Sequence, residues 1–204
     1  MDSKEHWEAI YRTTVADTVS WYRPHLEISL RLICDVTPDL SAAIIDVGGG
    51  QSTFADDILA RGYQDLTVLD MSAVALNATK KRLGSIAEQI TWFESDITAV
   101  DLPEHRYDVW HDRAVFHFLT EPSQRYAYIY ALTRALKPGG CIVLATFGPR
   151  GPDRCSGLEV KRYDAEQLSS ELGTGFKLVT SLIEDHQTPA GSCQQFLYCC
   201  FRKR

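Results

Sequence analysis

The stretch from Ile44 to Ser52 has the residue types and spacing of a ligand-binding turn. The apolar run Ile44-Ile45-Asp46-Val47 leads into Gly48, Gly49 and Gly50, and apolar residues at helical spacing follow. This order predicts a buried parallel strand, a tight turn and the start of a helix. Glycine suits such a turn because a backbone without Cβ atoms can bend sharply and approach a ligand closely. A tight turn that binds nothing is the alternative.

Asp70 is a second residue with a chemical role to consider, since it closes the apolar run 66–69 about 20 residues after the glycines. A carboxylate there offers two coplanar acceptor oxygens, which suit the two hydroxyls of a ribose. The alternative is that Asp70 caps the helix that follows. The glycine spacing does not fit the dinucleotide fingerprint, and there is no Walker lysine.

Further polar residues follow the ends of two later apolar runs. Ser95-Asp96-Ile97 comes after the run 90–94, and His111 and His117 come after the run 107–110. Ligands of open α/β sheets bind beyond the carboxyl ends of the strands, so we expect these residues near one crevice. A histidine there could take a proton from an attacking atom. An ordinary turn at Asp96 and a core imidazole at His117 are the alternatives.

The elements that must position these residues alternate along the chain. We expect a first helix over 2–12, capped by Asp2 or Ser3, and a second that begins at Pro24 and ends at about 36. A third helix follows the glycines and ends at about 60, and two more cover 73–83 and 126–136. We expect strands at 44–47, 66–69, 90–94, 107–110, 141–147, 176–181 and 196–201. The turn Lys137-Pro138-Gly139-Gly140 predicts a glycine C-cap before the fifth strand. The segment 148–157 is too rich in Gly and Pro for regular structure and predicts a functional loop.

This series of motifs resembles class I S-adenosylmethionine (SAM)-dependent methyltransferases over residues 42–147. The matching features are Asp46-x-Gly48-x-Gly50, the acids after strands two and three, the polar end of strand four and Pro-Gly-Gly before strand five. The resemblance implies an α/β, Rossmann-like, seven-stranded and mostly parallel sheet with helices on both faces. It also implies an antiparallel C-terminal strand pair and the strand order 3-2-1-4-5-7-6. Residues 1–204 would then form one domain, with a helical lid at 1–40 and an acceptor-site loop at 148–163.

The resemblance also implies roles for individual residues. Cofactor-binding roles fall on residues of the turn, the strand ends and the aromatic N-terminal segment: Trp7, Tyr11, Trp21, Asp46, Gly48, Gly49, Gly50, Asp70, Met71, Asp96, Ile97 and His111. The N-terminal rings have an alternative role, which is to pack the first helix onto the body. His111 and His117 are the candidates for catalysis. Acceptor contacts are expected from Tyr22, Arg113, Phe147, Arg150 and Cys155.

The reaction implied is methyl transfer from SAM to a small-molecule acceptor, which leaves S-adenosylhomocysteine. A protein-lysine acceptor is one alternative, and a thiol or metalloid acceptor bound through Cys155 is another. A non-catalytic protein that binds SAM is a further alternative. Because the methyl group of SAM is already activated, alignment is the main task of the protein. The histidines show no metal-ligand spacing such as H-E-x-x-H, so we expect no metal.

Composition limits the remaining possibilities. A chain of 204 residues suits one domain, and 45% apolar with 24% charged residues is ordinary for a soluble globular protein. A formal net charge of −6 provides no basic face, which argues against nucleic acid as a partner. We expect a cytoplasmic protein that does not bind membranes, because no long apolar run or secretory segment is present. We expect it to be a monomer or a homodimer. Six cysteines without paired C-x-x-C spacing predict reduced thiols.

Overall fold

A seven-stranded sheet forms the centre of the protein in a computed structural model that describes residues 3–204. Its order is β3-β2-β1-β4-β5-β9-β8. The strands are β1 (Ala43–Val47), β2 (Asp65–Asp70), β3 (Ile90–Glu94), β4 (Tyr107–Arg113), β5 (Leu136–Phe147), β8 (Phe176–Gln187) and β9 (Cys193–Lys203). Strands β1 to β5 pair in parallel, and β9 pairs antiparallel with both β5 and β8. Since β8 and β9 are the sixth and seventh strands of this sheet, the predicted fold class and strand order are confirmed.

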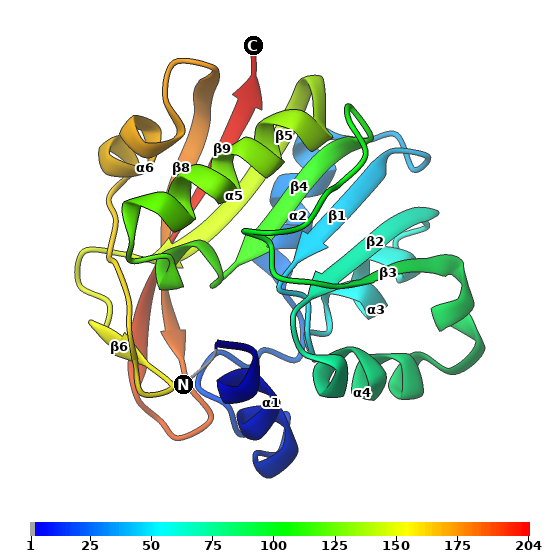
Figure 1. Ribbon diagram of the computed structural model, residues 1–204, viewed down its shortest axis with the longest axis vertical. Helices are drawn as coiled ribbons and strands as arrows, with labels where there is room; N and C mark the ends of the chain where they lie inside the picture. Colours follow the sequence, from blue (N-terminus) through cyan, green and yellow to red (C-terminus); the bar gives the residue numbers. More distant parts are fainter. Residues whose placement is uncertain (1–2) are drawn as a thin grey trace.

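Helices cover both faces of the sheet (Figure 1). On one face α5 (Pro122–Ala135) and α6 (Ala165–Leu172) pack against a core that contains Ile45 and Trp110. On the other face α2 (Glu27–Val36), α3 (Phe54–Ala60) and α4 (Ala73–Leu83) pack against a core that contains Ile44 and Val109. Neighbouring residues of β1 and β4 thus enter different cores, as expected for strands that are buried on both sides.

The N-terminal region has two parts with different positions. Helix α1 (Ser3–Thr13) lies beyond the carboxyl ends of the parallel strands, where it contacts α4 (Figure 1). Residues 14–26, which we call the strap, lead from α1 to α2. Helix α2 itself is a core helix, with Leu30 and Ile33 buried against the sheet. Only α1 and the strap are therefore placed as a lid would be, not the whole of residues 1–40. The proposed cap Asp2 lies outside the described residues.

Three local predictions differ from the structure. Helix α2 begins at Glu27, not at Pro24, which lies in the strap. The turn 137–140 is not a helix C-cap, because α5 already ends at Ala135 and Leu136 pairs with Tyr107 in the sheet. Pairing resumes between Cys141 and Val109, so residues 137–140 form an irregularity within β5. The segment 148–157 does contain regular structure, since β6 (Arg154–Cys155) pairs with β7 (Leu158–Glu159).

Two short 3-10 helices complete the chain, η1 (Gly84–Gln89) before β3 and η2 (Phe116–Phe118) after β4. Within residues 3–204, no helix has the length and apolar character that would let it cross a membrane.

Candidate active site

A cavity opens at the carboxyl ends of the parallel strands, beneath α1 and the strap. The residues after β1, β2, β3 and β4 form its floor, and the β6–β7 hairpin contributes one wall. Most of the predicted site residues line it: Trp7, Tyr11, Trp21, Tyr22, Asp46, Gly48, Gly49, Asp70, Met71, Asp96, Ile97, His111, Arg113, Phe147 and Cys155. Three predicted residues, Gly50, His117 and Arg150, do not.

The glycine turn is packed so closely that side chains are excluded from it. Gly48 has φ +69°, and a Cβ atom there would lie 2.0 Å from Cγ2 of Val115. The amide of Gly48 donates a 2.7 Å hydrogen bond to the carbonyl of Leu69, which closes the turn against β2. A Cβ atom on Gly50 would lie 2.9 Å from both Oδ2 of Asp70 and the hydroxyl of Tyr11. Only glycine fits this close packing, and it lets the backbone of Gly48 and Gly49 line the cavity.

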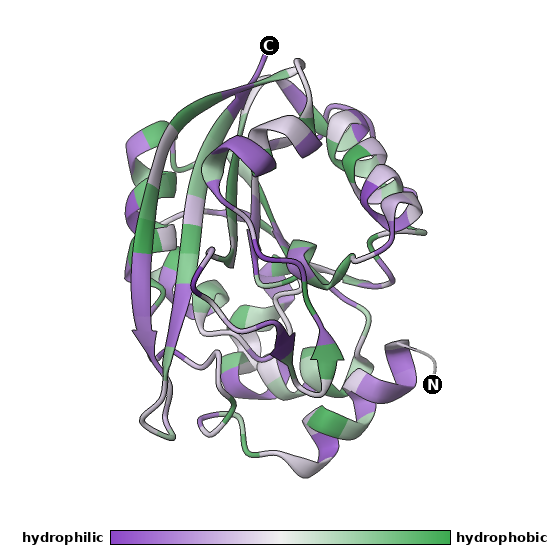
Figure 2. Ribbon diagram, turned by 90° about the vertical axis from the view of Figure 1, so that its left-hand side faces the viewer, coloured by the Kyte–Doolittle hydropathy of each residue, from purple (hydrophilic) through white to green (hydrophobic). Residues whose placement is uncertain are grey.

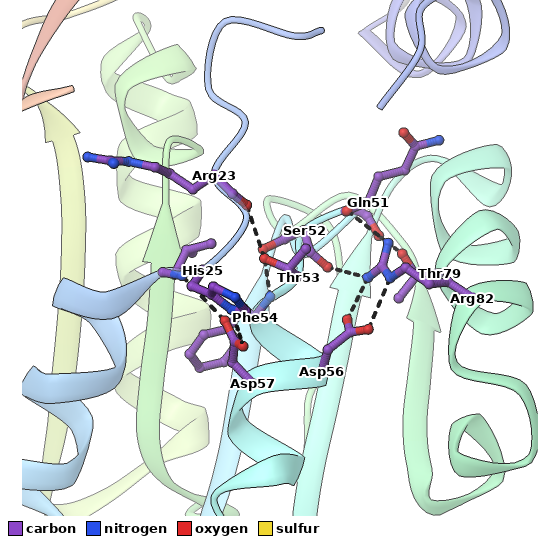
Figure 3. Close-up of polar contacts among 12 residues, drawn as sticks. Arg23, His25, Gln51, Ser52, Thr53, Phe54, Asp56, Asp57, Thr79 and Arg82 are labelled. Atoms are coloured by element: carbon purple, nitrogen blue, oxygen red, sulfur yellow. Dashed lines mark hydrogen bonds and ion pairs between the residues drawn. The ribbon is translucent and has the colours of Figure 1, made fainter. Parts of the chain in front are cut away.

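Side chains of α4 hold the carbonyls of this turn (Figure 3). Thr79 Oγ1 donates to the carbonyl of Gly50 at 2.6 Å. Arg82 donates to the carbonyls of Gln51 and Ser52, and it also pairs with Asp56 at 2.7 Å. The sequence reasoning missed these supports, because nothing near Arg82 in the chain indicates that the glycine turn packs against it.

Asp70 presents a desolvated carboxylate at the cavity wall. Its Oδ1 accepts a 2.8 Å hydrogen bond from the amide of Ser72, and the residue is 6% exposed. Burial, together with the nearby charge of Asp46, raises the pKa of Asp70 to about 7. The helix cap that the alternative assigned to Asp70 is instead made by Ser72, whose Oγ accepts from Ala75. Asp70 thus fits a ligand that brings hydroxyl donors to it.

Asp96 takes part in a turn and also lines the cavity. Its Oδ1 accepts hydrogen bonds from the amide and the hydroxyl of Thr98, both at 2.8 Å. The turn expected as the alternative is therefore present, and Asp96 and Ile97 line the cavity, as does Met71 after β2. The adenine contacts that the resemblance implies for these residues remain a prediction.

The two candidate bases do not have the geometry that proton transfer requires. His111 is 1% exposed, with one ring nitrogen 2.7 Å from Oδ1 of Asp46 and the other 2.8 Å from Oγ of Ser29. Nδ1 of His117 accepts from the amide of Phe147 at 3.1 Å, and this ring is fully buried. Burial lowers the pKa of His117 to about 3, and Arg113 contributes to the shift. Both nitrogens of His111 have partners, and Nε2 of His117 is buried outside the cavity lining, so the structure does not support either ring as a base.

The other end of the cavity is aromatic. Trp7 packs edge-to-face against two rings: its centroid lies 5.1 Å from that of Phe118 and 5.9 Å from that of Trp21. Phe147 and Phe196 form a similar pair at 4.9 Å. The sequence reasoning missed Phe118 and Phe196: Phe196 reaches this place only through the antiparallel register of β9 against Phe147.

The strap is fixed over this end by three separate elements. Arg113 of β4 donates to the carbonyl of Trp21 at 2.9 Å, and His186 of β8 lies 2.8 Å from the carbonyl of Ser20. Arg23 forms an ion pair with Glu184 of β8. Figure 2 shows that β8 changes from apolar to hydrophilic along its length, and its hydrophilic end is the one that meets the strap. On the other side, Thr53 donates to the carbonyl of Arg23 at 3.2 Å (Figure 3).

The cavity therefore has two ends of different chemistry. Glycines and carboxylates suit a nucleoside with an attached positive charge, and rings suit an apolar group that must be kept from water. No three His, Cys, Asp or Glu side chains gather as metal ligands within residues 3–204.

Comparison with known proteins agrees with this geometry. A family described as a methyltransferase domain matches residues 44–140, which run from β1 to the turn within β5. The eEF1A lysine and N-terminal methyltransferase of Mus musculus is 25% identical over 111 residues, which are 54% of this chain and 16% of that protein. Malonyl-[acyl-carrier protein] O-methyltransferase of Paenibacillus sp. (strain JDR-2) is 28% identical over 110 residues, 52% of this chain and 39% of that protein. The chain thus spans well under half the length of these relatives.

The similarity to solved structures extends over almost the whole chain. One is the 1,6-didemethyltoxoflavin-N1-methyltransferase of Burkholderia thailandensis, solved with 1,6-didemethyltoxoflavin and S-adenosylhomocysteine bound. It superposes with a TM-score of 0.74 at 18% identity and covers 98% of this chain and 86% of that one. At this identity the match shows a shared fold. The family match indicates a methyltransferase domain over residues 44–140, and the strand order and the structural similarity show the fold of class I SAM-dependent methyltransferases.

Proposed function

We propose that the protein transfers the methyl group of SAM to a small-molecule acceptor and releases S-adenosylhomocysteine. The observation that carries this proposal is the cavity with a carboxylate-lined end and an aromatic end, enclosed by α1 and the strap. When bound, SAM supplies a methyl group on a positively charged sulfur. The protein then has to hold the two reactants in line and exclude water.

The residues at the first end fit this cofactor. Asp70 would accept hydrogen bonds from the ribose hydroxyls, in addition to the backbone hydrogen bonds from Ser72 and Gly50 that it has in the free protein. Met71 and Ile97 contact the adenine ring, and Asp96 accepts from its amino group. The backbone of Gly48 and Gly49 lines the cavity, where it would meet the amino-acid end of the cofactor. His111 supports this end indirectly by holding Asp46.

Catalysis in this proposal needs alignment and no protein base. The rings of Trp7, Trp21 and Phe118 cover the aromatic end and keep water from the methyl group. They also provide π faces for the sulfonium charge. An acceptor atom that is already deprotonated, or an amine that loses its proton to solvent after the transfer, would react without proton transfer to His111 or His117.

A small acceptor is favoured by the way the cavity is covered. The strap is tied to β4, β8 and the start of α3, so the aromatic end lies beneath ordered backbone. Protein-lysine transfer is the second candidate, because the Mus musculus relative is named as a lysine methyltransferase. The Paenibacillus relative is named as an O-methyltransferase of malonyl-[acyl-carrier protein], so relatives of both kinds exist.

The thiol or metalloid alternative has weaker support. Cys155 lines the cavity, but it is only 6% exposed and burial raises the pKa of its thiol. Its Sγ lies 4.0 Å from Oγ of Ser20. A thiol kept protonated in this way is a poor nucleophile and a poor ligand for a soft metalloid.

Two measurements test the proposed function. Calorimetry with S-adenosylhomocysteine should show binding to the purified protein, and no binding would refute the assignment. Incubation with SAM labelled in its methyl group should then label the small-molecule fraction of a lysate. Label in proteins alone would favour the lysine alternative, and binding without any transfer would favour a non-catalytic SAM-binding protein. The expected cytoplasmic location and the expected monomer or homodimer remain predictions.

A further inference from the structure

Arg113 places an incompletely paired cation at the aromatic end of the cavity. It is the last residue of β4 and lines the cavity. Its Nε donates to the hydroxyl of Tyr198 at 2.9 Å, and its Nη1 donates to the carbonyl of Trp21 at 2.9 Å. Its Nη2 is buried and has no hydrogen-bond partner within residues 3–204. Among the described residues 3–204, no carboxylate lies close enough to Arg113 to form an ion pair with it.

This arrangement differs from that of the other arginine at the cavity wall. Arg23 also lines the cavity, but its charge is paired with Glu184. Arg113 has only neutral oxygens and a ring as partners, with its Cζ 4.4 Å from the centroid of Phe196. A guanidinium with a desolvated and unpaired N–H is costly, and an anionic oxygen is the group that relieves this cost best.

The charges of the cavity are separated in space. The carboxylates that line it, Asp46, Asp70 and Asp96, follow β1, β2 and β3 and belong to the cofactor end. At the opposite end burial lowers the pKa values of His117 and His186, and the positive charge of Arg113 adds to both shifts, while Glu184 opposes the shift at His186. An ammonium group of a lysine would meet a like charge there, and an anion would meet an opposite one.

The surfaces next to Arg113 are flat and apolar. Phe147 and Phe196 pack edge-to-face beside it, and Phe118 covers the same end from η2. Ring walls of this kind favour a planar aromatic ligand, because offset and edge-to-face contacts between rings are stabilising. The neutral thiol of Cys155 completes this end without adding charge.

We propose that the acceptor is a small aromatic acid whose carboxylate pairs with the guanidinium of Arg113 while its ring packs against the partly exposed rings of Phe118 and Trp21. The inference rests on the proposed function, since it names the class of molecule that occupies the acceptor end of that site. It assigns Arg113 as the residue that selects this class.

Calorimetry with paired probes tests the inference in the presence of saturating S-adenosylhomocysteine. The probes are benzoate, 4-hydroxybenzoate and naphthalene-2-carboxylate, each compared with its own carboxamide, which has nearly the same shape and no charge. We expect at least one carboxylate to bind with a millimolar or lower Kd and at least tenfold more tightly than its amide. Arg113→Met should abolish the preference, and Arg113→Lys should retain part of it.

Arg150→Met is the matched control, because Arg150 is exposed, lies outside the cavity and should leave the preference unchanged. Equal binding of acids and amides, or no binding of any acid at millimolar concentration, would overturn the inference. A preference that survives in both Arg113 variants would also overturn it. If Arg113→Met fails to fold, the wild-type preference and the Arg113→Lys variant still decide. Absence of S-adenosylhomocysteine binding would instead refute the proposed function, so the two failures are distinguishable.

Discussion

The two ends of the cavity are built in different ways. The cofactor end consists of short segments that directly follow β1, β2 and β3, and its shape depends on backbone turns such as the one at Gly48. The acceptor end brings together the strap, the end of β4, the β6–β7 hairpin and Phe196 of β9. The first end is therefore specified locally, and the second exists only when distant segments pack together.

The largest effect should come from crowding the turn. Gly48→Ala should lower the free energy of unfolding by roughly 2–5 kcal/mol, which combines left-handed strain with overpacking against Val115. Gly191→Ala is the control, because Gly191 also has positive φ but has open space around it. It should cost only the strain, about 1–2 kcal/mol. Urea denaturation measures both, and equal losses would show that the turn is not closely packed.

Loss of one carboxylate at the cofactor end should weaken the affinity for S-adenosylhomocysteine. Asp70→Asn should weaken S-adenosylhomocysteine binding by about 1–3 kcal/mol, because the amide replaces an ionised acceptor of the ribose hydroxyls. Calorimetry at pH 8 measures this change, and Arg150→Met provides the control. Unchanged affinity in Asp70→Asn would mean that the nucleoside is held elsewhere.

The same carboxylate should make the stability of the ligand-free protein depend on pH. The pKa of Asp70 is about 7 in the folded protein, above its ordinary value of 3.8, so the folded state binds more protons than the unfolded state between these values. The contribution of Asp70 to stability therefore falls as pH rises from about 4 to 7. Relative to wild type, the free energy of unfolding of Asp70→Asn should rise by on the order of 2 kcal/mol between pH 5 and pH 8.

This comparison isolates Asp70 from other groups that titrate in the same range. Asp112, with a pKa of about 6, and His117, with a pKa of about 3, are present in both proteins, so their contributions cancel. Thermal unfolding of the two proteins without ligand at both pH values is the measurement. A difference in stability that does not vary with pH would show that Asp70 is not desolvated.

The smallest effect should come from the support behind the turn. Arg82→Met removes the donors to the carbonyls of Gln51 and Ser52 while retaining an unbranched side chain. We expect S-adenosylhomocysteine affinity to fall by about 0.5–1.5 kcal/mol, because the turn becomes less ordered before binding. Arg61→Met, on an exposed residue outside the cavity, is the control for calorimetry. No change in Arg82→Met would mean that the turn is rigid without this support.

The contrast between the two ends also explains what the sequence could predict. The fold, the glycine turn and the positions of Asp70 and Asp96 depend on spacing within short segments, and spacing can be read from a sequence. The partnership of Phe147 with Phe196 depends on the register of β9, and the role of Arg82 depends on how α4 packs. Neither has a local signal.

The histidines show what a local rule leaves open. Both lie near the polar end of β4, which predicts that both face the crevice. His111 does line the cavity, but its ring nitrogens lie against Asp46 and Ser29, and its ring stacks on Phe54 with 4.1 Å between the ring centroids. His117 packs back onto Phe147 from η2. Which face a polar residue takes at a strand end depends on partners from other elements, and the sequence does not name them.

A crystal structure with S-adenosylhomocysteine bound is the most direct test of the division into two ends. We predict that the ribose hydroxyls lie within hydrogen-bond distance of the Asp70 carboxylate, with the sulfur directed toward Phe118 and Arg113. A nucleoside bound away from Asp70, or seated among the rings beside Arg113, would contradict this account.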